Sequence, residues 1–255
     1  HIRYLDALGN VVHDESHNYL FSSWNTVYES TLNHFGASNY HLNFEMSSFS
    51  QTLDSVSVNF TNGRSVESHV LVAADGIGSM ARNTLIPRSK SVYAGYVAWR
   101  GMVRESTLPA SVCQRLSDAI TYFVYPHSHI LVYPIPDHDG RVTHGDRLIN
   151  FVWYCNYEPG QELTKLLTDK NGLLREVSVP LGLVSESNIA SMKAMARANL
   201  PTILSDIVQV TAEPFVQVIY DVEIDEMAFG RICLLGDAAM VVRPHAAAGT
   251  AKAAA

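Results

Sequence analysis

Apolar side chains recur along the chain at two spacings, which predict strands in some segments and helices in others. Two short strands are expected over residues 2–5 and 10–13. A helix is expected over 24–35, because its apolar side chains return every three or four positions behind a capping serine. Gly36 follows directly and is typical of a helix end.

A hairpin and a more buried strand are predicted next. Residues 56–60 alternate between apolar and polar side chains, and Asn62-Gly63 is a favoured turn before a second strand over 64–68. Residues 70–74 are continuously apolar, which is typical of a strand buried on both faces.

The rest of the chain predicts an antiparallel sheet with helices. The runs TYFVYP, HILVYPIP and LINFVWYCNY are aromatic and β-branched, and turn residues separate them. Helices are expected over 189–198 and 202–209, broken by Pro201, with strands over 215–222 and 232–235. The pattern therefore predicts a mixed α/β (α+β) fold.

Composition narrows the class of protein. The 255 residues are 47% hydrophobic and 17% charged, with a net charge of -7, as in an ordinary soluble globular protein. No basic run suggests nucleic acid, and no apolar stretch is long enough to span a membrane. Cys113, Cys155 and Cys233 are too far apart for a disulfide framework or a zinc site, so we expect no metal and a cytoplasmic location.

One turn carries a weak nucleotide-binding pattern. Gly76, Gly78 and Ala81 read G-x-G-x-x-A after the strand over 70–74, as in a dinucleotide fingerprint. That fingerprint also needs an acidic residue about 20 positions later, and the next carboxylate is Glu105. An NAD(P)-dependent dehydrogenase is therefore the alternative and not the leading hypothesis.

A second pattern uses the same turn. Residues 75–82 read D-G-x-x-S-x-x-R, and residues 236–244 begin G-D-A-A and end in proline. In this order the two motifs resemble those of the class A FAD-dependent aromatic hydroxylases, the p-hydroxybenzoate hydroxylase-like flavoproteins. The segment RPHAAAG, residues 243–249, is most similar to the 2,6-dihydroxypyridine 3-hydroxylase branch. The resemblance also includes the segments SSWNTVYESTLNHF, VSVNFTNGR and AGYVAWRG, and it therefore extends over most of the chain.

The resemblance implies a flavin monooxygenase that hydroxylates an electron-rich aromatic or N-heteroaromatic ring, phenol-like or hydroxypyridine-like, through a flavin C4a-hydroperoxide. It implies FAD as cofactor, NAD(P)H as reductant, a small aromatic substrate and O2 as partners, and leaves a homodimer open. Part of a Rossmann-like FAD-binding domain is expected over 1–90 and 226–255, incomplete at both ends. An antiparallel-sheet substrate domain, 91–225, is expected as an insertion. The family's N-terminal G-x-G-x-x-G segment is absent, so the chain resembles a fragment.

The implied cofactor site combines carboxylates, small residues and a loop. A carboxylate at a strand end can accept hydrogen bonds from sugar hydroxyls, and small residues let the backbone approach a ligand. The residues assigned to it are Asp75, Gly76, Arg82, Gly236, Asp237, Ala238, Pro244, Ala248 and Gly249. His245 is the candidate catalytic residue, because a histidine beside the flavin loop could orient the substrate or move a proton.

Aromatic side chains of the predicted sheet are candidate walls of a substrate pocket. Alternate residues of a strand face opposite sides, so only part of the set can line one pocket. Arg100 has two open interpretations, an anionic substrate or a surface ion pair. The candidates are Tyr93, Tyr96, Trp99, Arg100, Tyr122, Tyr133 and Trp153. A truncated remnant without cofactor, acting as a binding module, is a further alternative to the enzyme.

Overall fold

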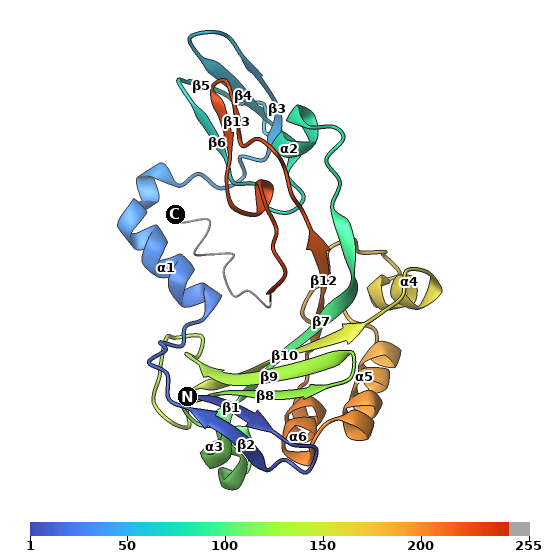
Figure 1. Ribbon diagram of the computed structural model, residues 1–255. Coiled ribbons are helices and arrows are strands. Elements are labelled where there is room, and N and C mark those ends of the chain that lie inside the picture. Colours follow the sequence, from blue (N-terminus) through green and yellow to red (C-terminus); the bar gives the residue numbers. More distant parts are fainter. Residues whose placement is uncertain (245–255) are drawn as a thin grey trace. The chain divides into compact units, whose positions relative to one another are not determined.

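The protein, seen as a computed structural model that describes residues 1–244, divides into two compact units (Figure 1). Unit 1 consists of residues 1–34 and 95–218. Unit 2 consists of residues 35–94 and those from 219 onward. The chain passes between the units three times, so neither unit is one continuous segment.

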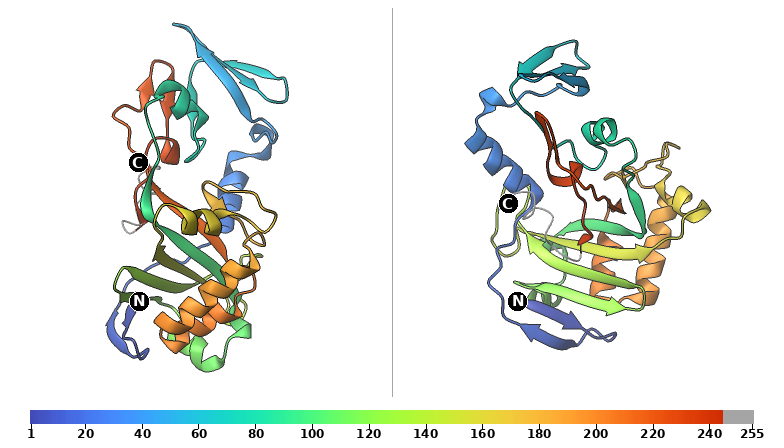
Figure 2. Two further views of the ribbon diagram at one scale, coloured as in Figure 1. Left: turned by 90° about the vertical axis from the view of Figure 1, so that its right-hand side faces the viewer. Right: turned by 45° about the horizontal axis from the view of Figure 1, so that its top comes forward.

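Unit 1 is built on an eight-stranded sheet with the order β11-β12-β7-β10-β9-β8-β1-β2, whose long central strands lie side by side in both views of Figure 2. The pairs β8–β9, β9–β10 and β10–β7 are antiparallel, whereas β1 pairs with β8 in parallel. The strands are β1 (Ile2–Leu5), β2 (Val11–Glu15), β7 (Val92–Arg104), β8 (Ile120–Tyr125), β9 (Ser128–Ile135), β10 (Leu148–Asn156), β11 (Ser178–Val179) and β12 (Phe215–Asp221). The predicted antiparallel sheet and both N-terminal strands are confirmed.

The central strands have two different faces because successive side chains alternate. Trp99 on β7 is paired with Trp153 on β10, and both side chains are fully buried. Gly101 lies on the same face, where a Cβ atom would come within 2.6 Å of Thr211 Cγ2 at the end of α6. We call this the helix-covered face, and the opposite face, which carries Arg100 and Met102, the pocket face.

Helices α3, α5 and α6 lie along one side of the sheet (Figure 1). Helices α5 and α6 confirm the predicted pair around Pro201, and α1 confirms the helix before Gly36, with the Ser23 hydroxyl accepting the Thr26 N–H at 3.1 Å. The sequence did not predict α3 or α4, which are each seven residues long. The helices of this part of the chain are α1 (Trp24–Phe35), α3 (Ala110–Leu116), α4 (Gln161–Leu167), α5 (Glu186–Asn199) and α6 (Thr202–Val210), with a short 3-10 helix η2 (Glu105–Thr107).

The domain boundaries differ from the predicted ones at the N-terminus. Residues 1–34 were expected in the FAD-binding domain with the rest of 1–90, but they belong to unit 1. The physical reason is strand pairing: β1 pairs with β8, and the Ile120 N–H donates to the His1 carbonyl at 2.9 Å. The other two boundaries, at 94/95 and 218/219, fall close to the expected 90/91 and 225/226.

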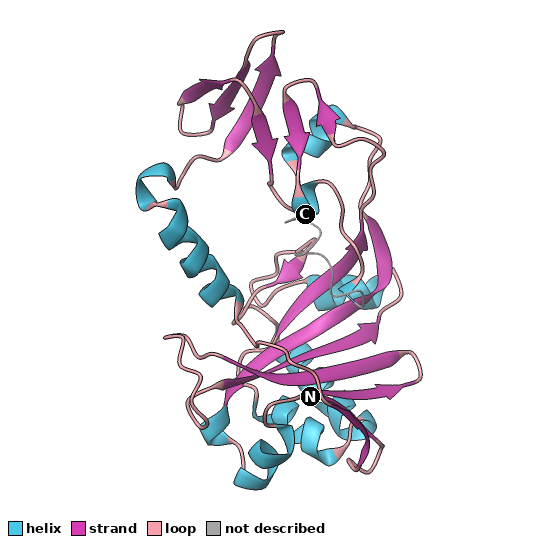
Figure 3. Ribbon diagram, turned by 60° about the vertical axis from the view of Figure 1, so that its left-hand side comes forward, coloured by secondary structure: helices cyan, strands magenta, loops and turns pink. Residues whose placement is uncertain are grey.

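Unit 2 contains two three-stranded sheets, β3-β4-β5 and β13-β14-β6 (Figure 3). The predicted hairpin is confirmed by β4 and β5, with Gly63 in the left-handed region at φ 80°. Strand β6 is less buried than predicted, since Val72 is 55% exposed and Ala73 only 3%. The elements are β3 (Met46–Gln51), β4 (Val56–Phe60), β5 (Ser65–Ser68), β6 (Leu71–Ala73), β13 (Ala228–Phe229), β14 (Ile232–Leu234), α2 (Met80–Leu85), η1 (Ala37–Asn39) and η3 (Gly236–Ala238).

The helices of residues 1–244 include none that combines the length and the apolar character needed to cross a bilayer. The predicted mixed α/β class, with a large sheet and smaller ones, is confirmed.

Candidate functional site

The two sequence motifs meet at one sheet edge in unit 2. Strands β6 and β14 are parallel neighbours, with Leu71 opposite Ile232 and Ala73 opposite Leu234. Parallel strands end at the same edge of a sheet, so the turn after β6 and the turn after β14 leave from the same side. The motif residues 75–82 and 236–244, far apart in sequence, therefore form one loop pair.

Asp75 caps the helix that follows it. Its Oδ1 accepts the Ser79 hydroxyl at 2.6 Å, and its Oδ2 accepts the Ala81 N–H at 3.2 Å. Ser79 is itself the N-cap of α2 and accepts the Arg82 N–H at 2.9 Å. A carboxylate at a helix N-terminus is stabilised by the free N–H groups there. Asp75 thus shapes the turn by local bonds.

Arg82 joins the two loops. Its side chain is buried, and Nη1 donates to the carbonyl oxygens of Asp237 at 3.3 Å and Ala238 at 3.1 Å. Nη2 donates to the carbonyl of Ile77 in its own turn. Burial lowers the pKa of Arg82, and the charge of Asp75 opposes that effect. The guanidinium is held by main-chain acceptors and links one motif to the other.

Asp237 differs from these two residues, because its side chain has no hydrogen-bond partner within residues 1–244 and is exposed to solvent. The preceding Gly236 adopts φ 62°, a conformation that favours glycine, and turns the chain out of β14. Around Gly76 and Gly78 a Cβ atom would meet nothing within 4 Å. Open backbone and an unpaired carboxylate fit a polyhydroxylated nucleotide cofactor.

The remaining predicted cofactor residues divide into two groups. Ala238 is fully buried, so its side chain serves packing. Pro244 is half-buried at the end of the described chain, next to Arg243, which is paired with Asp221 at 2.7 Å. Ala248 and Gly249 lie outside the described residues, as does the candidate catalytic residue His245.

The pocket face of unit 1 carries a cavity of about 480 Å³. Strands β7, β9 and β10 form its floor, and the start of α1 and the loop after β9 contribute to its walls. The lining residues are Ser22, Ser23, Trp24, Asn25, Arg100, Met102, Tyr133, Ile135, Pro136, Asp137, His138, Leu148, Asn150, Leu181 and Phe215. Most of this surface is apolar, and its polar groups come from the sheet, from the start of α1 and from the loop after β9, as is usual for small-molecule sites.

The structure separates the predicted substrate residues by strand alternation. Arg100 and Tyr133 line the pocket. Tyr96 and Tyr122 share the pocket face but contact other rings: Tyr96 lies 5.9 Å from Tyr154, and Tyr122 stacks on Tyr4 at 5.2 Å between ring centroids.

Three of the predicted substrate residues lie elsewhere. Trp99 and Trp153 are 0% exposed on the helix-covered face, so their assignment to a pocket wall was wrong. Alternation puts them opposite Arg100, on the face that packs against helices. Tyr93 belongs to unit 2, where its ring lies 6.2 Å from Tyr220.

Asn150 is one of the pocket residues that the sequence did not indicate. It lies on β10 between Met102 of β7 and Tyr133 of β9, and it is 8% exposed. The available signal was an amide flanked on both sides by apolar residues near the start of the run LINFVWYCNY, which is unusual in a buried strand.

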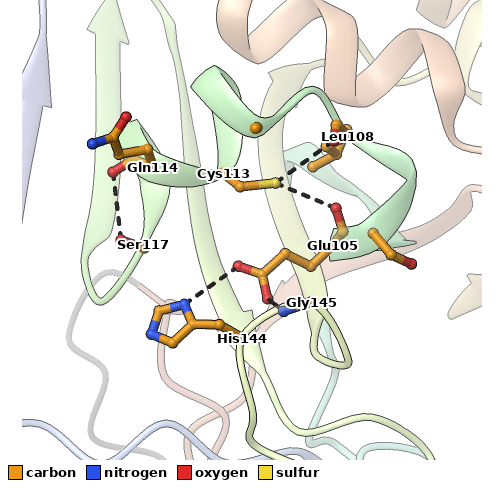
Figure 4. Close-up of a pocket in the computed structure, with 9 residues that line it drawn as sticks. Glu105, Leu108, Cys113, Gln114, Ser117, His144 and Gly145 are labelled. Carbon is orange, nitrogen blue, oxygen red and sulfur yellow. Dashed lines mark hydrogen bonds and ion pairs between the residues drawn. The ribbon is translucent and has the colours of Figure 1, made fainter.

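A second cavity in unit 1, of about 490 Å³, contains several polar groups that are bonded to one another. Figure 4 shows the Glu105 carboxylate with His144 and Gly145, and the Cys113 thiol directed at the carbonyl groups of Leu108 and Glu105. Burial would raise the pKa of Glu105, but hydrogen bonds from Arg147, at 2.7 and 3.0 Å, and from the Gly145 N–H lower it below its ordinary value.

The Cys113 thiol is not activated in this cavity. Burial, and secondly the negative charge of Glu105, raise the pKa of Cys113, so the thiol stays protonated at neutral pH. The cluster is therefore structural.

Comparison with known proteins identifies the family. Residues 93–221, about half of the chain, match a family model described as FAD binding domain-like. This chain belongs to that family. The resemblance to class A flavin hydroxylases that the two motifs predict is confirmed by similarity to a 2,6-dihydroxypyridine 3-monooxygenase over almost the whole chain.

Two of the relatives are similar to this chain over almost its entire length. This chain is 34% identical over 253 residues to the 2,6-dihydroxypyridine 3-monooxygenase of Paenarthrobacter nicotinovorans. The aligned region covers 99% of this chain and 62% of that protein. The solved structure of 2,6-dihydroxypyridine-3-hydroxylase from Arthrobacter nicotinovorans superimposes with a TM-score of 0.91 at 33% identity, covering 99% of this chain and 63% of that chain.

A more distant solved structure shares the fold. Klebsiella pneumoniae HpxO complexed with FAD and uric acid has a TM-score of 0.63 at 21% identity, covering 89% of this chain and 50% of that one. This chain thus spans 62% and 63% of the length of the two dihydroxypyridine hydroxylases, which is somewhat less than two thirds.

Proposed function

We propose that this chain is part of an FAD-dependent monooxygenase that adds a hydroxyl group to an electron-rich aromatic or N-heteroaromatic ring, with NAD(P)H as reductant and O2 as co-substrate. The observation that carries the proposal is the loop pair of unit 2, in which Arg82 ties the turn after β6 to the turn after β14. Similarity to a 2,6-dihydroxypyridine 3-monooxygenase over 99% of the chain supports a phenol-like or hydroxypyridine-like substrate.

Unit 2 is the proposed FAD-binding part. The open backbone at Gly76 and Gly78 would let the cofactor approach closely, and the unpaired Asp237 carboxylate would accept hydrogen bonds from its hydroxyl groups. Asp75 and Arg82 would act on the cofactor indirectly, by fixing the shape of the two loops. Pro244, His245, Ala248 and Gly249 are proposed to lie beside the flavin ring on the resemblance alone. When bound, FAD supplies the reduction of O2 that the hydroxylation needs.

Unit 1 is the proposed substrate-binding part. Its pocket is mostly apolar, which suits a flat ring and excludes the water that would compete with hydroxylation. The polar side chains of Arg100, Tyr133 and Asn150 would set the orientation of that ring.

A cytoplasmic location is also proposed. Cys113, Cys155 and Cys233 are all free thiols, which supports a reducing compartment. A homodimer is compatible with the family resemblance.

A dehydrogenase that uses Gly76, Gly78 and Ala81 is not favoured. Ala81 is fully buried in α2, and the negative charge of Asp75 occupies the N-terminus of that helix, where a pyrophosphate would have to lie.

Cofactor binding can be tested at Asp237. In the full-length protein, Asp237→Ala should weaken FAD binding about tenfold to a hundredfold, because a hydrogen bond to a charged group contributes about 1.5–3 kcal/mol. Titration of the apoprotein with FAD, followed by flavin fluorescence, measures the affinity. Asp225→Ala, at an exposed acid of the same unit, is the control and should bind like the wild type. Equal affinities for all three proteins would remove Asp237 from the site.

The activity itself is tested by product analysis. The full-length protein with FAD, NAD(P)H and 2,6-dihydroxypyridine should yield a product that is heavier by one oxygen atom, and ¹⁸O₂ should supply that atom. Oxidation of NAD(P)H that proceeds without FAD, or without oxygen incorporation into any phenol or hydroxypyridine offered, would contradict the proposal.

A further inference from the structure

The loop that presents Asp237 is held in place at its beginning. Residues 236–243, which we call the carboxylate loop, follow directly after β14. The buried Arg82 donates to the main-chain carbonyl of Asp237 at 3.3 Å, and the Met240 N–H donates to the Gly236 carbonyl at 2.9 Å. The backbone on either side of the Asp237 side chain is therefore fixed by hydrogen bonds.

The far end of the carboxylate loop is attached to the chain that leaves β12. Val241 and Val222 form an antiparallel bridge: the Val241 N–H donates to the Val222 carbonyl at 2.9 Å, and the Val222 N–H donates to the Val241 carbonyl at 3.3 Å. Next to this bridge, the Arg243 guanidinium donates to both carboxylate oxygens of Asp221, with distances of 2.7, 3.0 and 3.1 Å. A two-pronged pair fixes the orientation of its partners as well as their separation.

The Asp221–Arg243 pair is partly exposed. The Asp221 side chain is 38% exposed and that of Arg243 53%, so the pair contributes less to global stability than a buried pair would. Hydrogen bonding from Arg243 lowers the pKa of Asp221 below its ordinary value, although burial opposes the shift. Asp221 is therefore ionised at neutral pH, and we expect the pair to act mainly on the position of the loop.

The Asp237 side chain itself takes no part in holding the loop. It is exposed and has no hydrogen-bond partner within residues 1–244, whereas the backbone of its loop is bonded on both sides. A polar group that is fixed in space without serving the fold is preorganised for a ligand, because binding then requires little further ordering of the chain.

We propose that Asp221 and Arg243 are positioning residues for the Asp237 carboxylate. This inference rests on the proposed function and adds two residues to the cofactor site that act through Asp237. The ion pair and the adjacent backbone bridge hold the carboxylate loop in the conformation that binds the cofactor hydroxyl groups. Without the pair, part of the binding free energy is used to order the loop.

Equilibrium binding of FAD to the full-length apoprotein tests the inference. Asp221→Asn and Arg243→Met should each weaken FAD binding about two- to fivefold, the range expected for a partly exposed ion pair. The reversed pair, Asp221→Arg combined with Arg243→Asp, should recover most of the loss. The matched control is Asp14→Asn, which removes an ion pair of the same 2.7 Å length with Arg3 in unit 1 and should bind FAD like the wild type.

Two further measurements distinguish positioning from general destabilisation. In the Asp237→Ala background, which lacks the carboxylate to be positioned, Asp221→Asn should cause no further loss of FAD affinity. In the apoprotein without any cofactor, Asp221→Asn should speed amide hydrogen exchange at Val241, because its N–H is bonded in the adjacent bridge.

The results separate this inference from the proposed function. Equal losses from Asp221→Asn with and without the Asp237 carboxylate, or no loss in either case, overturn the positioning role even if the enzyme hydroxylates its substrate. Unchanged hydrogen exchange at Val241 also overturns it. A wild-type apoprotein that binds no FAD overturns the proposed function, and faster exchange in Asp221→Asn then still shows that the ion pair anchors the loop.

Discussion

Arg82 shows how one side chain can account for a pair of motifs. Both motifs are recognisable in the sequence, and their resemblance assigns Asp75 and Arg82 to the cofactor, but the bonds that these two side chains form are not predictable from it. The Arg82 guanidinium donates hydrogen bonds to the carbonyl groups of Ile77, Asp237 and Ala238, and Asp75 caps α2. Main-chain acceptors leave no mark in the sequence, which is why residue types alone could not reveal this link.

Replacing Arg82 should therefore damage the loop pair before it affects any chemistry. Arg82→Met leaves buried carbonyl groups without donors, and we expect the free energy of unfolding to fall by about 1.5–3 kcal/mol. Urea denaturation monitored by circular dichroism measures this change. Arg88→Met, at an exposed arginine just after α2, should have little effect. Similar stability of the two variants would contradict the linking role of Arg82.

At the scale of elements, the sequence predicted where the strands are better than which way their side chains point. The run around Trp153 read correctly as a strand, and the principle of alternation was available. Which face is covered by helices depends on contacts between distant segments, such as Gly101 with the end of α6. Helices α3 and α4 were missed because seven residues give too short an apolar repeat to recognise.

Gly101 offers a test of the helix-covered face. A Cβ atom at this position would lie 2.5 Å from Phe151 Cε1 and 2.6 Å from Thr211 Cγ2. Gly101→Ala should therefore lower the free energy of unfolding by about 1–3 kcal/mol, as is usual for overpacking. Gly78→Ala, where a Cβ atom meets nothing within 4 Å, is the control for thermal unfolding without cofactor. An unchanged melting temperature for Gly101→Ala would show that the face is less tightly packed.

The pocket face should make the protein sensitive to high pH. Burial raises the pKa of Tyr154 to about 12, above its ordinary value of 10.0, because the phenolate would lose its hydration. A raised pKa in the folded state means that the stabilising contribution is complete below pH 10 and is lost as the pH rises through 12. Tyr154→Phe should flatten this alkaline fall in the melting temperature, whereas Tyr19→Phe, at a half-exposed tyrosine, should not. If the melting temperature fell equally steeply with rising pH in Tyr154→Phe and in the wild type, Tyr154 would not be the cause of the alkaline destabilisation.

At the scale of the whole molecule, the sequence predicted two interleaved units and placed two of the three crossings between them within a few residues. It failed for residues 1–34, because a parallel pairing of β1 with β8 joins segments that are more than 100 residues apart in sequence. Local patterns cannot specify such a partner.

The same pairing predicts what happens when the N-terminal strands are removed. Deletion of residues 1–15 takes away β1 and β2 and leaves the edge of β8 with unpaired N–H and C=O groups, which favours intermolecular pairing. We expect concentration-dependent association, measured by light scattering. The substitution Leu8→Lys, in the exposed turn between the two strands, retains both strands and should leave association unchanged. A deletion variant that stays monodisperse at high concentration would contradict this role for β1.

The adjacency of Trp99 and Arg100 on β7 limits how the length of the chain can vary. Trp99 is buried against helices, and its immediate neighbour Arg100 lines the cavity. A slip of β7 by a single position would exchange the two, forcing a guanidinium into the interior and an indole into the cavity, and it would do the same to every pair along the strand. Insertions and deletions should therefore be tolerated only beyond the ends of β7, whereas a change of two residues inside it would preserve the faces and move only the position of the charge along the groove.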